Sequence, residues 1–217
     1  MLTHPQIEHC PLFRDLSTED RAYALTYFDS KTRTYEKGDF LHQVSFPLQR
    51  FGLVLSGSVQ VYMDDIDGHH IIMAHVEPGG LFGESYAFLG IDAPIYICAV
   101  SEAEILWMSP HRIKAPVSPV SQLDQELSNR FVACLASRTL QMNQRIQILS
   151  RNTLRTKLIT FLSQYATEKG DSFTIPFDRA SMAAYLGSDR SALSRELSRM
   201  QAEGILTYHR NHFRILK

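Results

Sequence analysis

The stretch "GSDRSALSRELSRM", Gly187–Met200, decides the interpretation of this chain of 217 residues. It predicts a helix that begins after Ser188 or Asp189, one of which supplies the N-terminal cap. A glycine directly before the cap permits a tight turn from a preceding helix. Three apolar side chains at i, i+4 and i+7 form the buried face: Leu193, Leu197 and Met200.

The opposite face of this predicted helix carries short hydroxyl groups and guanidinium groups. Its members are Ser191, Ser194, Arg195 and Ser198, with Arg190 in the first turn and Arg199 one turn beyond Arg195. The major groove of B-DNA admits one helix, and arginine can bond a guanine edge at two points. We therefore interpret the helix as one that binds base edges. The alternative is a solvated helix in which Glu196 pairs with its arginine neighbours.

The flanking segments predict a winged helix. A helix ending at Gly170, the short strand "FTIPF" and a helix capped by Asp178 precede the quoted stretch. The tail "GILTYHRNHFRIL" predicts two short strands around a polar tip, Arg210–His212. Helix, strand, helix–turn–helix and hairpin, in this order, are typical of a winged helix. Arg210 at the tip therefore joins the candidate contacts to nucleic acid.

Residues up to about Pro110 predict short strands. Runs such as "RFGLVLSGSVQVYM" and "IYICAVSEAEILWM" are rich in β-branched and aromatic residues and are separated by turn-forming clusters. One such cluster, "DDIDG" (Asp64–Gly68), is predicted to be a turn. A helix capped by Ser17 precedes the strands, with Asp20 at the matching position of a capping box. Short strands at this spacing favour an antiparallel barrel or sandwich.

Residues 119–152 predict one long helix, because no glycine or proline interrupts them after the first position. An apolar seam runs along it, with one stripe of residues seven apart and a second stripe beside it: Leu135, Met142 and Leu149, then Leu127, Phe131 and Ile146. We predict that this seam pairs with a twin in a homodimer, although Arg138 and Arg145 interrupt a strict heptad. The alternative is a helix packed on its own barrel.

Charge is divided unevenly along the chain. The net charge is −1, with +5 on residues 151–217 and −6 on residues 1–150, which predicts a surface for a polyanion in the C-terminal third. No apolar run reaches the ~20 residues of a membrane span, and no secretory signal opens the chain. We therefore expect a cytoplasmic protein without a membrane partner. Three scattered cysteines fit reduced cytosolic thiols better than a disulfide framework: Cys10, Cys98 and Cys134.

Four motifs together resemble the Crp/Fnr family of bacterial transcription regulators. They are "YEKGDFL", "LVLSGSVQVY", "PGGLFGESYAFLG" (Pro78–Gly90) and "LGSDRSALSREL". The resemblance implies an α+β fold: an N-terminal antiparallel β-barrel like the cyclic-nucleotide-binding domain (residues 1–115), a dimerisation helix (116–150) and a C-terminal winged helix-turn-helix (151–217). It further implies a homodimer on a palindromic double-stranded DNA site, with RNA polymerase as an additional partner and no enzymatic activity.

The resemblance places Arg190, Ser191 and Arg195 where many relatives carry Arg, Glu and Arg facing bases. Both arginines match. Ser191 replaces a glutamate that can accept a hydrogen bond from cytosine N4, so the preferred half-site should differ from that of the cyclic AMP receptor protein. The residues predicted to contact DNA are Ser188, Asp189, Arg190, Ser191, Ser194, Arg195, Arg199 and Arg210.

The effector site is where the chain departs most from relatives that bind cyclic AMP. In those relatives the glutamate of FGE holds the ribose, and an Arg-Ser or Arg-Thr pair further along the chain holds the phosphate. Gly83 and Glu84 match, but Pro94 and Ile95 stand at the phosphate positions, so we expect an effector other than cyclic AMP. The candidate pocket residues are Gly83, Glu84, Ser85, Tyr86, Met142 and Asn143.

Other sensor chemistries stay open. An iron–sulfur cluster needs several cysteines near the N-terminus, where the chain has only Cys10, so we do not expect one. Cys134 offers a thiol switch between subunits; otherwise it and Cys98 are small core residues. Haem is an alternative, and the simpler interpretation is that the histidines face solvent or are satisfied in the core. The candidate axial ligands are His4, His9, Cys10, His42, His69, His70 and His75.

Three further hypotheses concern the barrel. A cupin-like enzyme would use His69, His75 and Glu77 on one strand face to hold a metal. At ~3.3 Å per residue these three lie too far apart for one ion, so no metal site is expected. Alternatively, Tyr86 and Phe88 close the pocket, and the protein binds DNA without sensing anything. A small apolar or aromatic effector fits the same residues.

Overall fold

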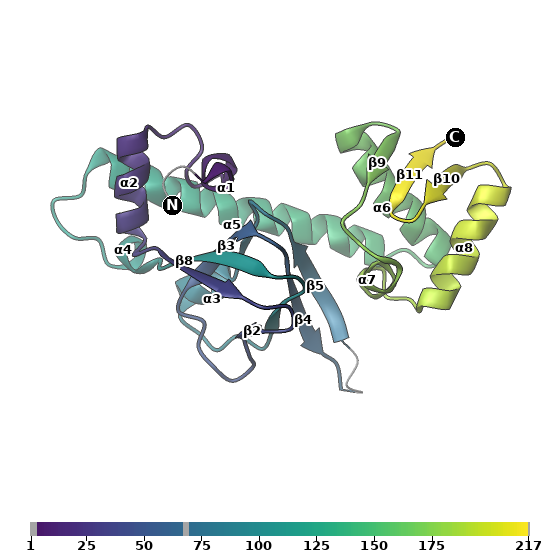
Figure 1. Cartoon of the computed structure of the whole chain (residues 1–217), viewed down its shortest axis with the longest axis horizontal. Helices are drawn as coiled ribbons and strands as arrows, with labels where there is room; N and C mark the ends of the chain where they lie inside the picture. Colours follow the sequence, from purple (N-terminus) through teal and green to yellow (C-terminus); the bar gives the residue numbers. More distant parts are fainter. Residues whose placement is uncertain (1–3, 67–69, 217) are drawn as a thin grey trace. The chain divides into compact units, whose positions relative to one another are not determined.

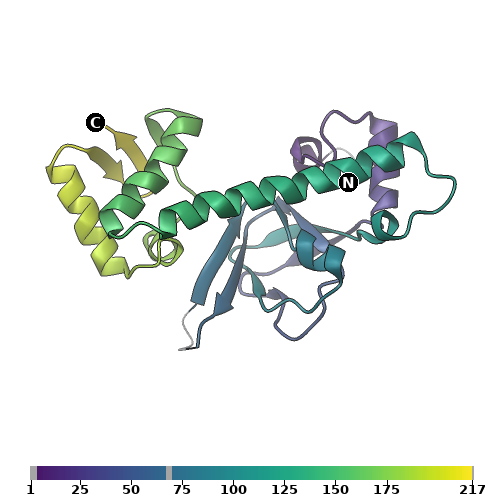
Figure 2. The same cartoon turned by 180° about the vertical axis from the view of Figure 1, so that it is seen from behind.

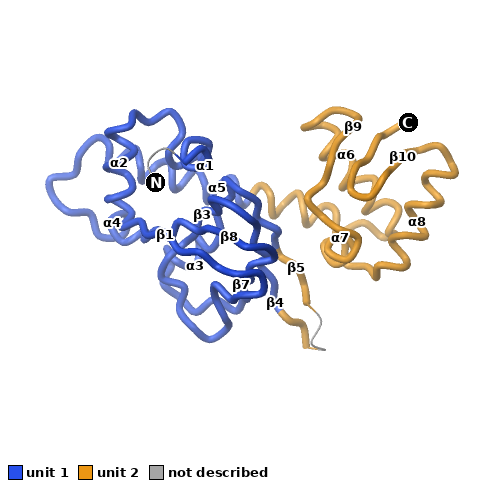
Figure 3. The backbone as a smooth tube through the Cα atoms, viewed as in Figure 1, with its two compact units in different colours: residues 1–63, 74–139 blue, residues 64–73, 140–217 orange. Residues whose placement is uncertain are grey.

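The computed structural model describes residues 4–66 and 70–216. Contacts divide the chain into two compact units, residues 1–63 with 74–139 and residues 64–73 with 140–217 (Figure 3). One long helix, α5 (Gln122–Leu149), has residues in both units (Figure 1, Figure 2). The predicted long helix is therefore present, and each unit can be described around its own part of α5.

The first unit opens with two short helices, α1 (Pro5–His9) and α2 (Thr18–Tyr27). Ser17 Oγ accepts a hydrogen bond from the Asp20 backbone N–H at 3.0 Å and donates one to the Asp20 carboxylate at 2.8 Å. The first of these bonds satisfies a backbone N–H that has no partner within the helix. The predicted cap of α2 is thus confirmed.

Two four-stranded sheets follow. The first has the order β1 (Lys31–Tyr35), β8 (Ala103–Met108), β3 (Phe51–Ser56), β6 (Leu81–Phe82), and the second has the order β2 (Phe40–His42), β7 (Tyr96–Ala99), β4 (Val59–Asp64), β5 (His70–Val76). Strand β8 pairs antiparallel with β1 and β3, and β7 pairs antiparallel with β2 and β4. The predicted N-terminal antiparallel β domain is confirmed, although its described strands form two sheets rather than one closed cylinder. The predicted turn Asp64–Gly68 extends outside the described residues.

Phenylalanine rings join the helices to the first sheet in the core of this unit. Phe28 meets Phe13 and Phe51 edge-on, with ring centroids 6.2 and 5.8 Å apart. Phe51 in turn lies 5.2 Å from the ring of Phe131 on α5. Phe131 and Leu127 are fully buried in this core. The prediction that these two side chains face a twin helix is therefore wrong, because apolar groups of the same chain cover them.

Arginines of α5 donate to backbone carbonyl groups. Arg138 Nη2 donates to Leu81 O at 3.3 Å, and Arg145 Nη1 donates to Met73 O at 2.5 Å. Arg145 is buried, and its guanidinium lies 4.6 Å from the centre of the Tyr185 ring. Both arginines turn toward carbonyl groups of their own unit, while the seam residues at 142, 146 and 149 remain exposed.

The second unit has the predicted order of a winged helix. Its elements are α6 (Leu154–Lys169), β9 (Ser172–Thr174), α7 (Arg179–Tyr185), α8 (Arg190–Ala202), β10 (Leu206–His209) and β11 (His212–Ile215). The strands form one sheet in the order β10-β11-β9. Gly187 in the turn between α7 and α8 adopts φ +61°, which glycine tolerates. The predicted buried face of α8 is confirmed for Leu193, Leu197 and Met200.

Candidate nucleic-acid interface

Helix α8 begins after a capping residue whose carboxylate also holds the hydroxyl group of Ser191. Asp189 accepts a hydrogen bond from Ser191 Oγ at 2.5 Å and another from the Ala192 backbone N–H at 2.8 Å. These two bonds hold the pKa of the Asp189 carboxyl below its usual range. Asp189 is therefore the cap. Ser188 lies in the turn, where its backbone N–H donates to Ala183 O at 2.9 Å.

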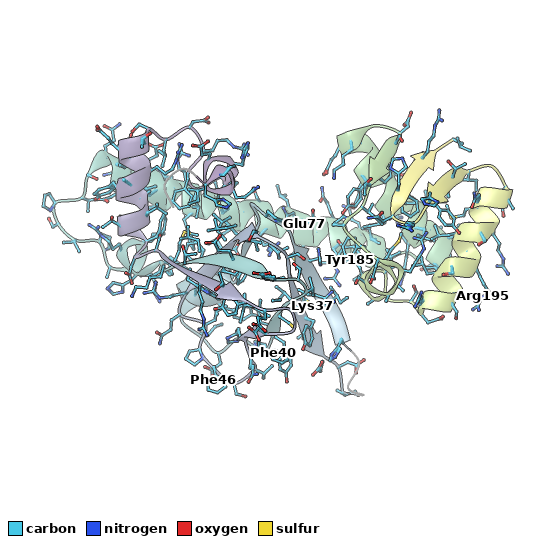
Figure 4. All side chains as sticks on the ribbon, in the orientation of Figure 1. Lys37, Phe40, Phe46, Glu77, Tyr185 and Arg195 are labelled. Carbon is cyan, nitrogen blue, oxygen red and sulfur yellow. The ribbon has the colours of Figure 1, made fainter. Side chains whose placement is uncertain are left out.

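The exposed surface of α8 brings five of the predicted residues together. They line one open hollow: Asp189, Arg190, Ser191, Ser194 and Arg195. Figure 4 shows Arg195 on the outer side of α8. Within residues 4–66 and 70–216, neither Arg190 nor Arg195 has a carboxylate oxygen within 4.0 Å. Both guanidinium groups are therefore free to bind an external acceptor.

The acidic residue of α8 is bound by another helix. Glu196 accepts a hydrogen bond from Arg155 Nε of α6 at 2.6 Å, and Arg155 Nη2 donates to Glu203 at 2.7 Å. The bonds to Glu203 and then to Glu196 raise the pKa of the Arg155 guanidinium. Arg199 lies 3.7 Å from Glu196. The solvated-helix alternative therefore applies to Arg199 alone among the described arginines of α8, and sequence reasoning missed Arg155.

Two serine hydroxyls of α8 donate to carbonyl groups one turn earlier in the helix. Ser194 Oγ donates to Arg190 O at 2.9 Å, and Ser198 Oγ donates to Ser194 O at 3.0 Å. Each hydroxyl then keeps lone pairs that can accept from outside the helix. The surface around the two arginines therefore consists of short polar side chains, which allow a close approach by another molecule.

Arg210 lies at the tip of the β10–β11 hairpin, as predicted. Its backbone adopts φ +53°, and its side chain is exposed. The Arg210 carbonyl accepts a hydrogen bond from Arg179 Nη2 at 2.9 Å. Sequence reasoning missed Arg179, because its position after the Asp178 cap gave no sign that it reaches the hairpin.

The candidate effector-pocket residues around α3 (Glu84–Leu89) differ from one another in burial. Gly83 caps this helix with φ +79°, and a Cβ at this position would lie 2.6 Å from Leu48 Cδ2. Glu84 is buried, and burial raises the pKa of its carboxyl, while the charge of Arg138 opposes the rise. Ser85 is exposed and Tyr86 is half-buried. The glutamate is thus a core group in this structure.

The two positions that the family resemblance assigns to the phosphate of a cyclic nucleotide carry an exposed Pro94 and a buried Ile95. Neither side chain can donate a hydrogen bond or supply a positive charge. These two side chains therefore offer no charge-assisted hydrogen bond to a phosphate. The other two candidates, Met142 and Asn143, belong to the second unit and are exposed there.

Several described histidines have local partners. His42 is buried with Nε2 3.3 Å from Ala93 O, and His9 Nδ1 lies 2.6 Å from Pro5 O. In residues 4–66 and 70–216 there is no group of three or more His, Cys, Asp or Glu side chains placed to hold a metal ion. His69, a ligand in the haem and cupin hypotheses, lies outside the described residues.

The two buried cysteines are poorly suited to fast redox chemistry. Burial raises the pKa of the Cys10 thiol to about 12 and that of Cys134 to about 11. A thiol with such a pKa stays protonated near neutral pH, and the thiolate is the reactive form. These surroundings disfavour the hypothesis of a thiol switch at Cys134.

Two families match the chain. The "Cyclic nucleotide-binding domain" family matches residues 32–115, and the "Crp-like helix-turn-helix domain" family matches residues 156–217. The fold and these matches together define a regulator with a β-sheet sensor domain, a long connecting helix and a DNA-binding helix-turn-helix domain. None of the helices that the structure describes is long and apolar enough to cross a membrane.

The relatives extend over nearly the whole chain. The cyclic AMP receptor protein of Thermus thermophilus is 28% identical over 200 residues, covering 90% of this chain and 88% of that protein. The global nitrogen regulator of Nostoc sp. is 23% identical, with coverage of 92% and 95%. The solved structure of a CooA mutant from Carboxydothermus hydrogenoformans has a similar fold, with a TM-score of 0.71, 20% identity and coverage of 94% and 88%. The chain belongs to the Crp/Fnr family of transcription regulators.

Proposed function

We propose that this chain is a homodimeric, sequence-specific regulator in which α8 of each subunit enters the major groove of DNA. The observation that carries the proposal is the pair Arg190 and Arg195 on a capped helix face, with no carboxylate partner among the described residues. Guanidinium groups in this setting can bond guanine O6 and N7 together. The short side chains of Ser191 and Ser194 allow α8 to approach the floor of the groove closely.

The candidate residues divide into three roles. Arg190 and Arg195 bind base edges and carry sequence choice. Arg199 further along α8 and Arg210 at the hairpin tip bind phosphates, which fix orientation without sequence information. Ser188 and Asp189 form the turn and the cap, and Ser191 and Ser194 adjust the fit to the groove.

The homodimer forms through α5. Its exposed and half-buried side chains follow a heptad: Val132, Leu135, Thr139, Met142, Ile146 and Leu149. Val132 and Ile146 keep 57% and 58% of their surface exposed. Knobs-into-holes packing against a second copy would bury this seam. Two-fold symmetry then places the two α8 helices about one DNA turn apart, ~34 Å, on a palindromic site.

The sensor domain responds to a molecule other than cyclic AMP. Pro94 and Ile95 support this part of the proposal, because they supply neither a charge nor a donor to a phosphate. An effector with apolar or aromatic groups suits these side chains better. It would act through different affinities for the two arrangements of the dimer that do and do not fit DNA.

Selection from a random duplex library tests the DNA-binding part. The purified protein should enrich sites with two inverted half-sites, and a library that shows no enrichment would refute sequence-specific binding. Native mass spectrometry and an absorption spectrum of protein purified without oxygen test the sensor part. A colourless dimer of bare polypeptide mass is expected, whereas a Soret band would show that the protein carries haem.

A further inference from the structure

A cavity lies in the first unit between α2, α4 (His111–Lys114), the segment 116–120 and the first turns of α5. Figure 1 shows α2 and α4 at the same end of α5. The volume of the cavity is about 300 Å³, at the lower end of the range of about 300–1,000 Å³ that small-molecule sites occupy. The cavity shares no lining residue with the candidate effector pocket, so it is distinct from that pocket.

The cation of this cavity is Arg112 of α4, which lies against aromatic rings. Its guanidinium is 5.0 Å from the centre of the Tyr27 ring and 6.0 Å from that of Tyr23. Among residues 4–66 and 70–216, no carboxylate oxygen lies within 4.0 Å of this guanidinium, and no acceptor receives a hydrogen bond from it. The rings orient Arg112, and its N–H groups remain available to an anion that enters the cavity.

Asp124 of α5 also lines the cavity, but its carboxylate is already bonded within the protein. Tyr23 Oη donates to Oδ1 at 2.7 Å, and the Ser121 backbone N–H donates to Oδ2 at 3.0 Å. Burial by itself would raise the pKa of this carboxyl, but the bonds from Ser121 and Tyr23 outweigh burial and hold the pKa below its usual range. Asp124 therefore stays ionised near neutral pH. It repels an anionic group that Arg112 attracts, which fixes the end of a ligand that meets Arg112.

Two amide side chains of the lining have no partner in the described part of the chain. They belong to Gln125 and Asn129, which lie one turn apart on α5. The neighbouring hydroxyl groups, by contrast, are satisfied by the protein. Ser128 Oγ donates to Asp124 O at 2.8 Å and lies 3.2 Å from Tyr27 Oη, so Tyr27 is the donor in this second bond. The two amides can therefore donate to a ligand or accept from it.

The segment that closes the cavity on another side is apolar. Val117 and Val120 line it and keep 62% and 44% of their surface exposed. An apolar group in the cavity would remove this surface from water, which favours binding. The lining thus combines a cation, free amides and an apolar wall, as small-molecule sites commonly do.

We propose that this cavity binds a small organic acid with one carboxylate and an apolar body of one or two rings. The carboxylate forms a bidentate pair with the guanidinium of Arg112. The apolar body covers Val117 and Val120, and the amides of Gln125 and Asn129 bond its polar substituents. Because the ligand contacts α2, α4 and α5 together, binding stabilises the folded first unit. The proposal does not depend on DNA binding by α8.

A second copy of the chain is the competing occupant. Gln125 lies seven residues before Val132, so it continues the heptad of the proposed α5 seam toward this cavity. The unpaired guanidinium of Arg112 favours an acid over an apolar side chain of a second copy, because covering a charged group with apolar atoms is costly.

The test titrates the full-length protein with 2-naphthoate and with the neutral 2-naphthamide, by isothermal calorimetry. The wild type should bind 2-naphthoate about tenfold or more tightly than 2-naphthamide, because a charge-assisted hydrogen bond is the stronger kind. Arg112→Gln should lose this difference. Lys114→Gln removes the same charge from an exposed position of α4 outside the cavity, so it is the matched control and should bind as the wild type does. Val117→Ser should weaken the binding of both compounds.

Thermal unfolding shows whether each variant is folded, and 2-naphthoate should raise the Tm of the wild type but not that of Arg112→Gln. Equal affinity of the wild type for both compounds would refute the carboxylate site. Unchanged affinity of a folded Arg112→Gln for 2-naphthoate would place the ligand elsewhere and refute the proposal. If Arg112→Gln does not fold, unchanged affinity of Val117→Ser has the same meaning. A wild type that does not bind 2-naphthoate at millimolar concentration also refutes the proposal, and binding by Ile146→Glu alone would then show that a second copy covers the cavity.

Discussion

Arg195 and Arg199 lie one turn apart on α8, yet their surroundings differ. Arg199 is 3.7 Å from Glu196, a carboxylate that Arg155 also holds. Arg195 has no such partner among the described residues. A free guanidinium can direct two donors at one base, whereas a paired one keeps part of its charge within the protein. At the residue scale, base recognition and general attraction to DNA are therefore separable by substitution.

Replacing Arg195 with alanine should weaken binding to the selected site by about 1–3 kcal/mol and affect random DNA much less. Arg199→Ala should weaken both DNAs to a similar, smaller extent, because a phosphate contact is insensitive to sequence. Fluorescence anisotropy on the two duplexes measures both variants. Equal losses on both duplexes for Arg195→Ala would show that it binds a phosphate and not a base.

Asp178 gives the winged helix an acid-sensitive contact. Its carboxylate accepts from the Ser181 backbone N–H at 2.7 Å, and this bond is the main reason that its pKa lies below the usual 3.8. A lowered pKa stabilises the fold above about pH 3.8, and this contribution is lost as the pH falls through the folded-state pKa. Asp178→Asn keeps a neutral cap, so the wild type should be slightly more stable near pH 7, with the difference shrinking near pH 3. Urea unfolding at both pH values measures it, and a difference that does not change with pH would contradict this role.

At the scale of elements, α5 contributes side chains to two different surfaces. Leu127 and Phe131 enter the core of the first unit, and Arg138 and Arg145 bond carbonyl groups of neighbouring strands or turns. The seam that includes Val132 and Ile146 is left exposed. An apolar seam of this length on a helix is typical of pairing between subunits. The helix therefore contributes side chains to the core of the first unit and carries an exposed apolar seam, which we propose as the subunit interface.

Ile146→Glu should convert the dimer to a monomer, because two like charges would face each other across the α5 seam. Gln147→Glu adds the same charge at the next exposed position and should remain dimeric. Sedimentation equilibrium measures the mass of both variants. The monomer should lose on the order of 100-fold or more in affinity for a two-half-site duplex, since its two DNA contacts are no longer linked. A dimeric, tightly binding Ile146→Glu would place the interface elsewhere.

At the scale of the whole molecule, the N-terminal two thirds of the chain and the C-terminal third carry net charges of opposite sign. Residues 151–217 carry +5, which suits a polyanion, and residues 1–150 carry −6. An effector bound by the first unit can alter DNA binding only if it favours one arrangement of the dimer over another. The match to the cyclic-nucleotide-binding domain family therefore does not by itself define the signal.

Cyclic AMP at millimolar concentration should leave the DNA affinity of the wild type unchanged. The physical reason is that Pro94 and Ile95 offer no compensation for burying a phosphate. Isothermal titration without DNA measures whether cyclic AMP binds, and anisotropy with DNA measures whether it changes the DNA affinity. Tighter DNA binding in the presence of cyclic AMP, within the 5–150-fold range typical of allosteric coupling, would show that another part of the chain holds the phosphate.

The candidate DNA-binding helix could be predicted from the sequence because its determinants are local. The Asp189 cap and the spacing of Leu193 and Leu197 act within a few residues and do not depend on distant segments. The order of elements in the winged helix is local in the same sense, and so is the glycine turn at Gly187.

The sequence by itself determined which faces are apolar and where helices begin, while the tertiary structure decided what covers those faces. Periodicity cannot distinguish a core from a subunit interface. The predicted subunit seam therefore includes Leu127 and Phe131, which the structure buries in the core of the first unit. Arg155 and Arg179 act on groups 31 or more residues away, at Glu196 and Arg210. Such contacts form only when the chain closes on itself, because they depend on the packing of separate elements and not on any spacing along the sequence.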